Sequence, residues 1–251
     1  MNMPSVLVVG PSAIGKTVAV AQALNPDHSF WICTEPGALE PMFNLELNPW
    51  KKIPPMAECL STHKPASEVQ RWVQYCLDEH AKGRIKAVVL DTLSTLCERE
   101  WAYIRNSLRV DEGYGRANRA LGLSINPLIY DLLSVRSLLV CMICHEKESS
   151  TIEGKFMPGG PKLPGDLIKT VPAQFDICIR VGVEAGQRIM KVDPLDRTFL
   201  TKDRYSVITD GEKLDLRSVL KRVLDRKRAF TNGLTASQTL TPVSDGKELG
   251  K

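Results

Sequence analysis

Four short apolar runs divide the first 145 residues of the chain. They are rich in Val, Leu, Ile and Cys, and their hydrophobic positions do not alternate strictly with polar ones. This pattern is typical of strands that are buried on both faces of a parallel sheet. The four predicted strands span residues 5–10, 29–34, 86–91 and 137–144.

Helical periodicity fills the segments between these strands. The three predicted helices span residues 15–24, 67–83 and 116–135. Ser67 and Gln70 fit a capping box at the start of the second helix, and Gly83 fits its end. Pro127 predicts that the third helix is kinked or broken. Strands that alternate with helices predict an α/β fold with a mostly parallel central sheet flanked by helices.

The pattern changes after residue 172. Short apolar segments there predict a final core strand followed by antiparallel strands, over residues 175–183, 187–192, 197–201 and 204–208. Residues 213–230 read as a basic amphipathic helix, and residues 231–251 are rich in Thr, Ser and Gly and predict a flexible tail. The main domain is therefore expected to span residues 1–212.

The amino-acid composition is that of an ordinary globular protein and excludes few functional classes. The 251 residues are 43% hydrophobic and 25% charged, and the net charge of +4 permits a local basic patch without implying nucleic acid. No run of about 18 apolar residues is present, so no membrane span is expected. Seven cysteines at irregular spacing, with no signal peptide before the first strand, favour reduced thiols and a cytoplasmic location.

The segment GPSAIGKT at residues 10–17 carries the clearest chemistry. It fits the phosphate-loop pattern G-x-x-x-x-G-K-[ST], with an apolar strand before it and a helical pattern after it. Lys16 would place its charge on the outer phosphates, and the Thr17 hydroxyl would bind Mg²⁺. The candidate ATP-binding residues of the loop are Gly10, Pro11, Ser12, Ala13, Ile14, Gly15, Lys16 and Thr17.

Three polar residues end the other predicted strands. Asp91 is expected to hold Mg²⁺, together with Thr17, through water. Glu35 is a candidate to orient or deprotonate the attacking water. His145 is a candidate to hydrogen-bond the γ-phosphate and to report its loss. Read alone, Glu35 and His145 are also compatible with exposed polar residues at strand ends.

Two cations stand one residue apart in the segment RTFLTKDRYSV, residues 197–207. Lys202 and Arg204 fall between two predicted short strands, and a solvated hairpin tip is the simplest interpretation. Alternate residues of a strand point to the same side, so both cations could also reach one phosphate.

The order of these parts resembles the RecA-like ATPase core. The chain looks most like the compact phage members of that superfamily, the RecA-like single-strand annealing proteins of the Sak-four group, over roughly residues 4–210. The phosphate loop alone is specific only to P-loop proteins, and the ordered set of elements carries the resemblance. In RecA-like rings and filaments a neighbouring subunit supplies cations to the ATP, and Lys202 and Arg204 match that K-x-R pattern.

The resemblance also implies two mobile DNA-binding loops, at about residues 97–116 and 147–170. Both segments place cations beside aromatic residues, which suits a single strand whose bases can stack. An amphipathic helix with a basic face is the alternative for the first segment, and a disordered surface loop for the second. The candidate DNA-binding residues are Arg105, Arg109, Arg116, Lys155, Phe156 and Lys162.

The expected function is that of an ATP-dependent single-stranded DNA-binding protein for phage recombination or annealing. It would hydrolyse ATP with Mg²⁺ at interfaces of a homo-oligomeric ring or filament, with DNA stimulating turnover. A single-stranded DNA-binding protein is a candidate further partner, and the host cytoplasm is the expected location if a phage encodes the chain. The alternatives are a ring-forming helicase-like motor, a small-molecule kinase and a non-hydrolysing scaffold. A kinase would need an acceptor pocket and an Arg-bearing lid, and intact Glu35 argues against the scaffold.

Overall fold

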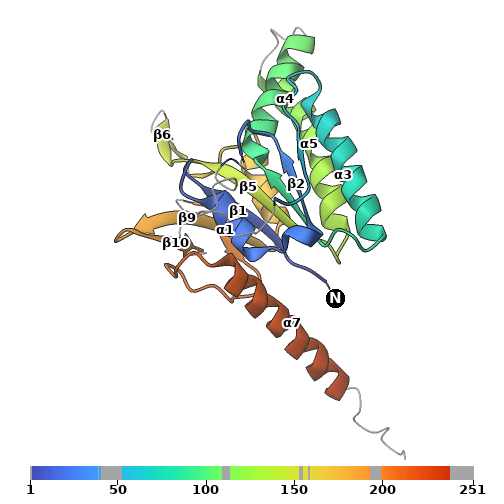
Figure 1. The fold of residues 1–251 in the computed structure, drawn as a ribbon. Helices are drawn as coiled ribbons and strands as arrows, with labels where there is room; N and C mark the ends of the chain where they lie inside the picture. Colours follow the sequence, from blue (N-terminus) through green and yellow to red (C-terminus); the bar gives the residue numbers. More distant parts are fainter. Residues whose placement is uncertain are drawn as a thin grey trace, which may run out of the picture.

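A nine-stranded sheet organises the molecule (Figure 1). The computed structural model describes residues 2–38, 40, 53–108, 114–152, 155–157, 159–192 and 199–237. The main path through the sheet runs in the order β10-β9-β1-β5-β4-β2-β3, while β8 pairs with β5 and β11 pairs with β9. The strands are β1 Ser5–Gly10, β2 Ser29–Cys33, β3 Met56–Glu58, β4 Ala87–Asp91, β5 Leu139–Lys147, β8 Gly160–Pro161, β9 Ile177–Glu184, β10 Gln187–Lys191 and β11 Lys202–Asp203.

The four buried strands that the apolar runs predict are confirmed as β1, β2, β4 and β5. They pair in parallel, and every residue of β1, β2 and β4 is buried, which explains why their hydrophobic positions do not alternate. Strand β5 continues to Lys147, beyond its predicted end at residue 144, because Glu146 and Lys147 pair with the antiparallel strand β8.

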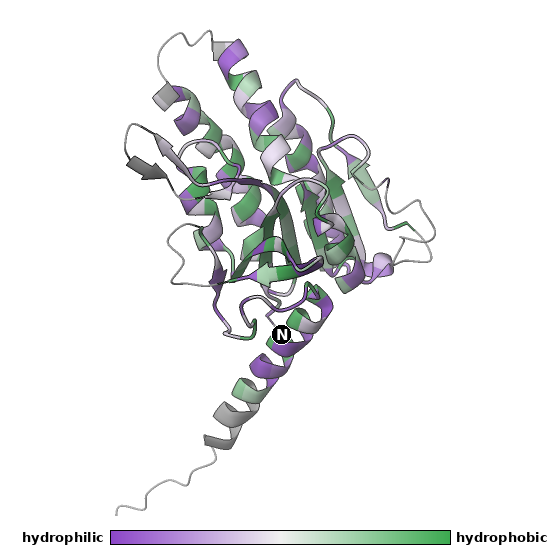
Figure 2. Cartoon of the chain, turned by 90° about the vertical axis from the view of Figure 1, so that its left-hand side faces the viewer, coloured by the Kyte–Doolittle hydropathy of each residue, from purple (hydrophilic) through white to green (hydrophobic). Residues whose placement is uncertain are grey.

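Helices cover both faces of the sheet (Figure 1). On one face lie α3 Pro65–Ala81, α4 Leu93–Leu108 and α5 Tyr114–Ser134, and on the other lie α1 Lys16–Ala23 and α7 Leu216–Ser237. The remaining elements are the short helices η1 Pro26–His28 and α6 Leu167–Gln174 and the hairpin of β6 Ser150–Ile152 and β7 Lys155–Met157. Each layer has its own hydrophobic core, and the apolar strands lie between them (Figure 2).

One prediction about a helix start is wrong. Helix α3 begins at Pro65, and its N-cap residue Lys64 makes no side-chain capping bond, so Ser67 and Gln70 do not form a capping box. Proline suits the first helical turn because its fixed φ is already helical and its missing N–H would be unpaired there. Of the two alternatives predicted at Pro127, a kink or a break, the break is excluded, because α5 continues through this residue as one helix.

The antiparallel extension is confirmed in β9, β10 and β11, but the strand predicted at 204–208 is absent. The Asp203 carboxylate accepts hydrogen bonds from the backbone N–H groups of Tyr205, Val207 and Ile208 at 2.7–2.9 Å. These bonds fold the segment into a turn. Of the strand predicted at 197–201, residues 197 and 198 lie outside the described part, and Phe199 makes a single bridge to Gly159.

The C-terminal helix α7 is longer than predicted. It starts at Leu216 and continues to Ser237, so residues 231–237 of the predicted tail are helical. Residues 238–251 of that tail lie outside the described residues. Within the described part of the chain, no helix is both long and apolar enough to span a bilayer.

Candidate active site

The phosphate loop connects β1 to α1 at the carboxyl edge of the sheet. Gly15 has a φ of +92°, which favours glycine. A Cβ atom added to Gly10 would lie 3.0 Å from the carbonyl oxygen of Val181 in β9. The loop conformation therefore favours glycine at both positions of the motif. Gly10 is the point at which the loop packs against the backbone of β9.

Lys16 folds back over the loop that precedes it. Its side chain is buried, and Nζ donates hydrogen bonds to the carbonyl oxygens of Gly10 at 2.9 Å and Pro11 at 2.6 Å. Burial lowers the pKa of Lys16. The ammonium group is thus held above the loop, where the motif places the outer phosphates.

Thr17 and Asp91 meet as the sequence predicts. The Thr17 hydroxyl donates to Asp91 Oδ2 at 2.7 Å, and Asp91 is 2% exposed at the end of β4. Burial is the main cause that raises the pKa of Asp91 to about 6. Hard oxygen ligands of this kind suit Mg²⁺, which usually takes one or two carboxylates together with substrate phosphates.

The donor set fits that mode of metal binding. Among the described residues, no group of three or more His, Cys, Asp or Glu side chains could hold a metal by itself. One hydroxyl and one carboxylate beside a phosphate loop are therefore the available protein ligands, and they fit a magnesium ion that is shared with a nucleotide.

Glu35 lies beyond the end of β2 and receives three hydrogen bonds on one oxygen. Its Oε1 atom accepts from Thr92 Oγ1 at 3.0 Å and Thr95 Oγ1 at 2.5 Å, and it lies 2.5 Å from His145 Nε2. The contact with His145 is the largest cause that lowers the pKa of Glu35 to about 2. Because these contacts all reach Oε1, Oε2 is the oxygen that can accept a hydrogen bond from a water.

His145 joins Glu35 to the phosphate loop. Its Nδ1 atom lies 3.1 Å from Ser12 Oγ, and its backbone N–H donates to Ser94 Oγ at 3.0 Å. The sequence places Glu35 and His145 at the same edge of the sheet but gives no sign that they touch. The direct contact depends on the order of the strands, since β4 lies between β2 and β5.

Sequence reasoning missed one cation beside the loop. The Arg188 guanidinium, from β10, lies so close to the phosphate loop that a Cβ atom on Gly15 would be 3.0 Å from Arg188 Cζ. No motif marks this residue, because its position follows from the pairing of β10 with β9 at the sheet edge.

The family model described as AAA domain matches residues 2–205. The chain belongs to the AAA domain family. No curated protein sequence matches it. Among solved structures, a prototypical ATPase from the type III secretion system of pathogenic bacteria is similar, with a TM-score of 0.53 and 11% identity. The similarity covers 72% of this chain and 52% of that chain, so this chain spans about half the length of that ATPase.

The AAA domain therefore has the RecA-like P-loop NTPase fold that the ordered elements predict. Family membership and the phosphate-loop geometry together support a P-loop ATPase that binds nucleotide.

Lys202 and Arg204 lie at the amino edge of the sheet, opposite the phosphate loop. Lys202 pairs with Cys178 at the start of β9, whereas Gly10 ends the neighbouring strand β1. Lys202 Nζ donates to the carbonyl oxygen of Ala173 at 2.9 Å, and Arg204 forms a 2.9 Å ion pair with buried Asp176. Within one AAA domain, neither cation is placed to contact the nucleotide bound by that same chain.

The first predicted DNA loop is largely helical in this AAA domain. Residues 97–108 belong to α4, so the helical alternative is confirmed for this part of the segment and the mobile loop is not. The Arg105 guanidinium lies 4.7 Å from the centre of the Trp101 ring, and Arg116 is exposed near the start of α5. Arg109 lies outside the described residues.

The second predicted DNA loop is also partly ordered. It contains the β6–β7 hairpin, then β8 and the start of α6. Lys162 forms a 2.9 Å ion pair with Glu98 of α4, which brings the two predicted DNA segments into contact. Lys155 and Phe156 begin β7, but their side chains lie outside the described part.

Proposed function

We propose that this AAA domain is a Mg²⁺-dependent ATPase that hydrolyses ATP at interfaces between identical subunits and binds single-stranded DNA. Its role would be in recombination or annealing, as in the phage RecA-like annealing proteins that the sequence resembles. The observation that carries the ATPase proposal is the Thr17–Asp91 hydrogen bond of 2.7 Å beside the Lys16 ammonium. It joins the two halves of a nucleotide site that lie far apart in the sequence.

Each residue of the site has a distinct role in the proposal. Bound Mg²⁺–ATP supplies the phosphoryl group that is transferred to water. Lys16 exchanges its two carbonyl partners for phosphate oxygens, and Thr17 and Asp91 hold the ion. Glu35 orients the water through Oε2. Its low pKa keeps it ionised, so it serves mainly as a hydrogen-bond acceptor.

His145 is proposed to sense the nucleotide. Its imidazole contacts Ser12 in the phosphate loop and Glu35 at the end of β2. A phosphate in the loop competes for the same hydrogen-bonding atoms. Strand β5 then continues from His145 towards the β6–β7 hairpin, one of the proposed DNA segments, so a change at His145 has a direct covalent route to that hairpin.

The location of Lys202 and Arg204 supports hydrolysis between subunits. Cations at the amino edge of one sheet can reach a nucleotide at the carboxyl edge of another when copies contact head to tail. Such heterologous contacts generate either closed rings or open filaments. In this proposal Arg204 stabilises charge on the neighbour's transferred phosphoryl group, as an arginine finger does.

Single-stranded DNA binding rests on the two segments at the carboxyl edge. Arg105 stacks on Trp101 of α4, and an exposed guanidinium beside an aromatic ring suits phosphates and bases of a single strand. The Lys162–Glu98 ion pair holds the second segment against α4, so one strand could contact both.

ATPase rates with and without single-stranded DNA, measured alongside the mass of the assembly, test this proposal. We expect Mg²⁺-dependent turnover that DNA increases, and an oligomer in the presence of ATP. An ATPase that stays monomeric at full activity would contradict the interface mechanism.

A mixture of two inactive variants tests the interface mechanism directly. Arg204→Ala retains the phosphate site but lacks the finger, whereas Lys16→Ala retains the finger but lacks the phosphate site. The Arg204→Ala variant should lose about 10³-fold or more of its turnover while still binding nucleotide. Mixing the two should restore part of the activity, and no recovery in a mixture shown to co-assemble would refute a finger that acts between subunits.

A further inference from the structure

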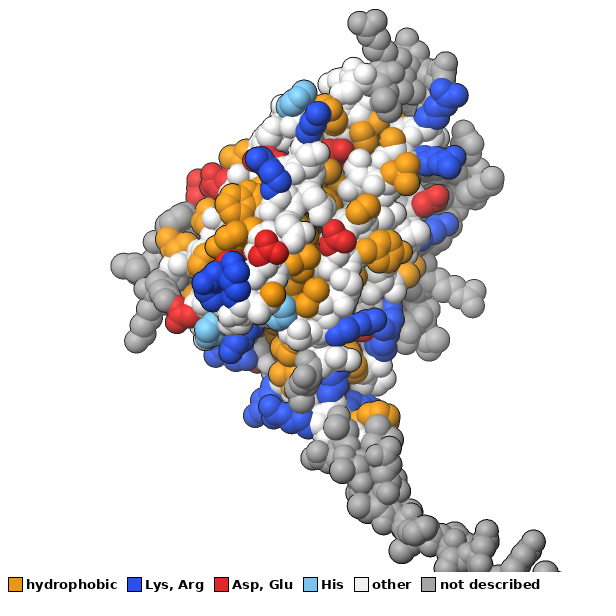
Figure 3. Space-filling model, turned by 90° about the vertical axis from the view of Figure 1, so that its right-hand side faces the viewer, with side chains coloured by type: hydrophobic (Ala, Val, Ile, Leu, Met, Phe, Trp, Pro, Cys, Tyr) orange, Lys and Arg blue, Asp and Glu red, His pale blue; other side chains and the backbone are white. Residues whose placement is uncertain are grey.

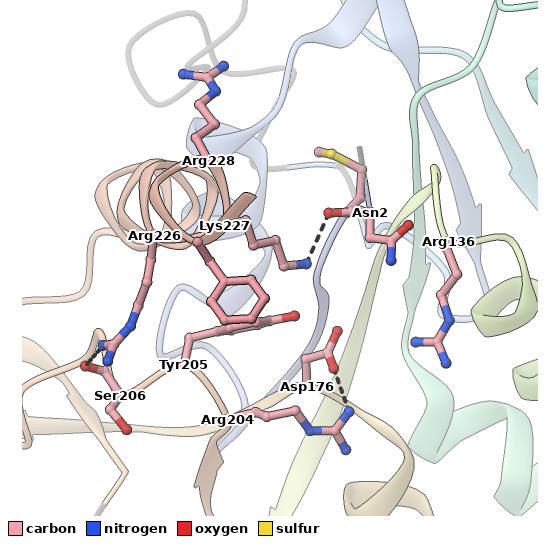
Figure 4. A pocket seen from close by; sticks show the side chains of 11 residues that line it. Asn2, Arg136, Asp176, Arg204, Tyr205, Ser206, Arg226, Lys227 and Arg228 are labelled. Atoms are coloured by element: carbon pink, nitrogen blue, oxygen red, sulfur yellow. Dashed lines mark hydrogen bonds and ion pairs between the residues drawn. The ribbon is translucent and has the colours of Figure 1, made fainter. Parts of the chain in front are cut away.

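A pocket of about 840 Å³ opens at the amino edge of the sheet, next to Arg204 (Figure 4). It lies between the N-terminal residues, the turn after β11 and helix α7, and Arg136 and Asp176 also line it, so five segments of the chain converge on it. Five cations and one acid line it: Arg136, Arg204, Arg226, Lys227, Arg228 and Asp176. A pocket with so many cations is suited to a compact, multiply charged anion.

Helix α7 brings two of these cations, Arg226 and Lys227, to the pocket on the face that elsewhere is apolar. Leu216, Val219 and Val223 are buried against the sheet. Positions three, four and seven residues beyond Val223 continue that face, and they are Arg226, Lys227 and Phe230. The face that packs on the core thus becomes cationic where the helix leaves the sheet, and Lys and Arg side chains gather there (Figure 3).

The cations of the pocket have two kinds of contact. Arg226 and Lys227 donate to backbone carbonyls, whereas Arg204 and Arg228 form ion pairs with Asp176 and Asp225. Lys227 Nζ donates to the backbone carbonyl of Asn2 at 2.9 Å and lies 4.7 Å from the Tyr205 ring centre. Arg226 donates to the backbone carbonyl of Ser206 at 3.0 Å. Burial lowers the pKa of Lys227, nearby Asp176 raises it and Arg136 lowers it. Five cations and one acid in the lining leave an excess of positive charge that an anion would offset.

We propose that this pocket receives the triphosphate of ATP bound by the phosphate loop of a second copy of the chain, and that Arg136 and Arg226 bind it together with Arg204. The inference rests on the proposed interface mechanism and adds two residues to it. Arg226 lies in α7, beyond the family match at residues 2–205, so this contribution belongs to the C-terminal helix of this chain.

Two features favour a nucleotide of a second copy over a strand of nucleic acid. The cations converge from separate segments on one pocket, whereas a strand requires an extended groove that follows its backbone. The pocket and the phosphate loop also lie at opposite edges of one sheet, which is the arrangement that a head-to-tail contact needs. Each Arg has five N–H donors, so contacts with Asp176 or Ser206 leave others for phosphate.

Arg136→Ala and Arg226→Ala test the inference, with Arg217→Ala as the matched control. Arg217 is exposed on α7 and does not line the pocket. We expect each pocket variant to lower DNA-free ATP turnover by about 10- to 100-fold, the effect of losing one charge-assisted hydrogen bond. ATP affinity of the isolated subunit should stay unchanged. Mixing either variant with Lys16→Ala should restore part of the activity, and the control should turn over as wild type.

Further measurements separate folding from function. Arg136→Lys keeps the charge and should retain more turnover than Arg136→Ala, and circular dichroism and thermal unfolding check that each variant folds. Wild-type turnover in both pocket variants, with Arg204→Ala impaired, would overturn this inference and leave the interface mechanism intact. Wild-type turnover in Arg204→Ala as well would overturn both. Loss of single-stranded DNA affinity with unchanged DNA-free turnover would instead identify a nucleic-acid site and refute the inference.

Discussion

Asp91→Asn should make the nucleotide-free protein more stable while removing its response to Mg²⁺–ATP. In the wild type the Asp91 carboxylate is 2% exposed, and burial raises its pKa from 3.8 to about 6. The ionised form is therefore disfavoured by folding. An amide of nearly the same shape carries no charge and can still accept the hydrogen bond from Thr17.

The size of the gain follows from the pKa. A difference of one in pKa corresponds to about 1.4 kcal/mol, so ionised Asp91 reduces the free energy of unfolding by about 3 kcal/mol. The pKa of about 6 already includes the attraction between Asp91 and Lys16, so that attraction is not subtracted again. An increase of about 3 kcal/mol raises Tm by roughly 6 to 12 °C in a chain of this size.

Urea unfolding at several pH values measures the effect. The folded-state pKa of Asp91 lies above the unfolded value, so the wild type loses this part of its stability as the pH rises from about 4 to about 7. The variant lacks that loss, and its advantage should be present at pH 7.5 and nearly absent at pH 4. Asp78→Asn, at an exposed position of α3, is the control and should show no such trend. A variant less stable than the wild type at pH 7.5, or one that Mg²⁺–ATP still stabilises normally, would refute this reasoning.

Three further predictions concern the site and the DNA segments. Lys16→Ala should abolish nucleotide binding, measured by titration calorimetry, and unchanged affinity would show that the loop is misassigned. Glu35→Gln should bind Mg²⁺–ATP but lose most turnover, and a wild-type rate would make Glu35 a structural carboxylate. Replacing Lys155, Phe156 and Lys162 together with Ala should weaken single-stranded DNA binding and reduce its salt slope by about 1.4, because two phosphate contacts are lost. An unchanged slope would locate the DNA elsewhere.

The elements that the sequence predicted correctly are those determined by interactions within a short segment of the chain. Continuous apolar runs identified β1, β2, β4 and β5, because only strands buried on both faces need them. The phosphate loop was recognisable because its backbone conformation favours glycine at two positions and a bound phosphate needs the charge of the lysine.

The parts that sequence did not reveal depend on contacts between distant segments. The strand predicted at 204–208 is absent because one carboxylate, Asp203, binds three backbone N–H groups. The contact between Glu35 and His145 follows from the order of strands in the sheet, which the sequence does not state. The position of Arg188 beside the phosphate loop follows from the pairing of β10 and could not be read from any motif.

Two backbone carbonyls of the phosphate loop compete with a bound phosphate for the Lys16 ammonium. The ammonium already has two carbonyl acceptors, on Gly10 and Pro11, so a bound phosphate gains only the difference between those partners and its own oxygens. A weakly charged anion offers little more than two carbonyl groups do, whereas a triphosphate offers much more. The loop therefore sets a threshold of charge density for entry, and selectivity for highly charged phosphates follows from the lysine's alternative partners as well as from the shape of the loop.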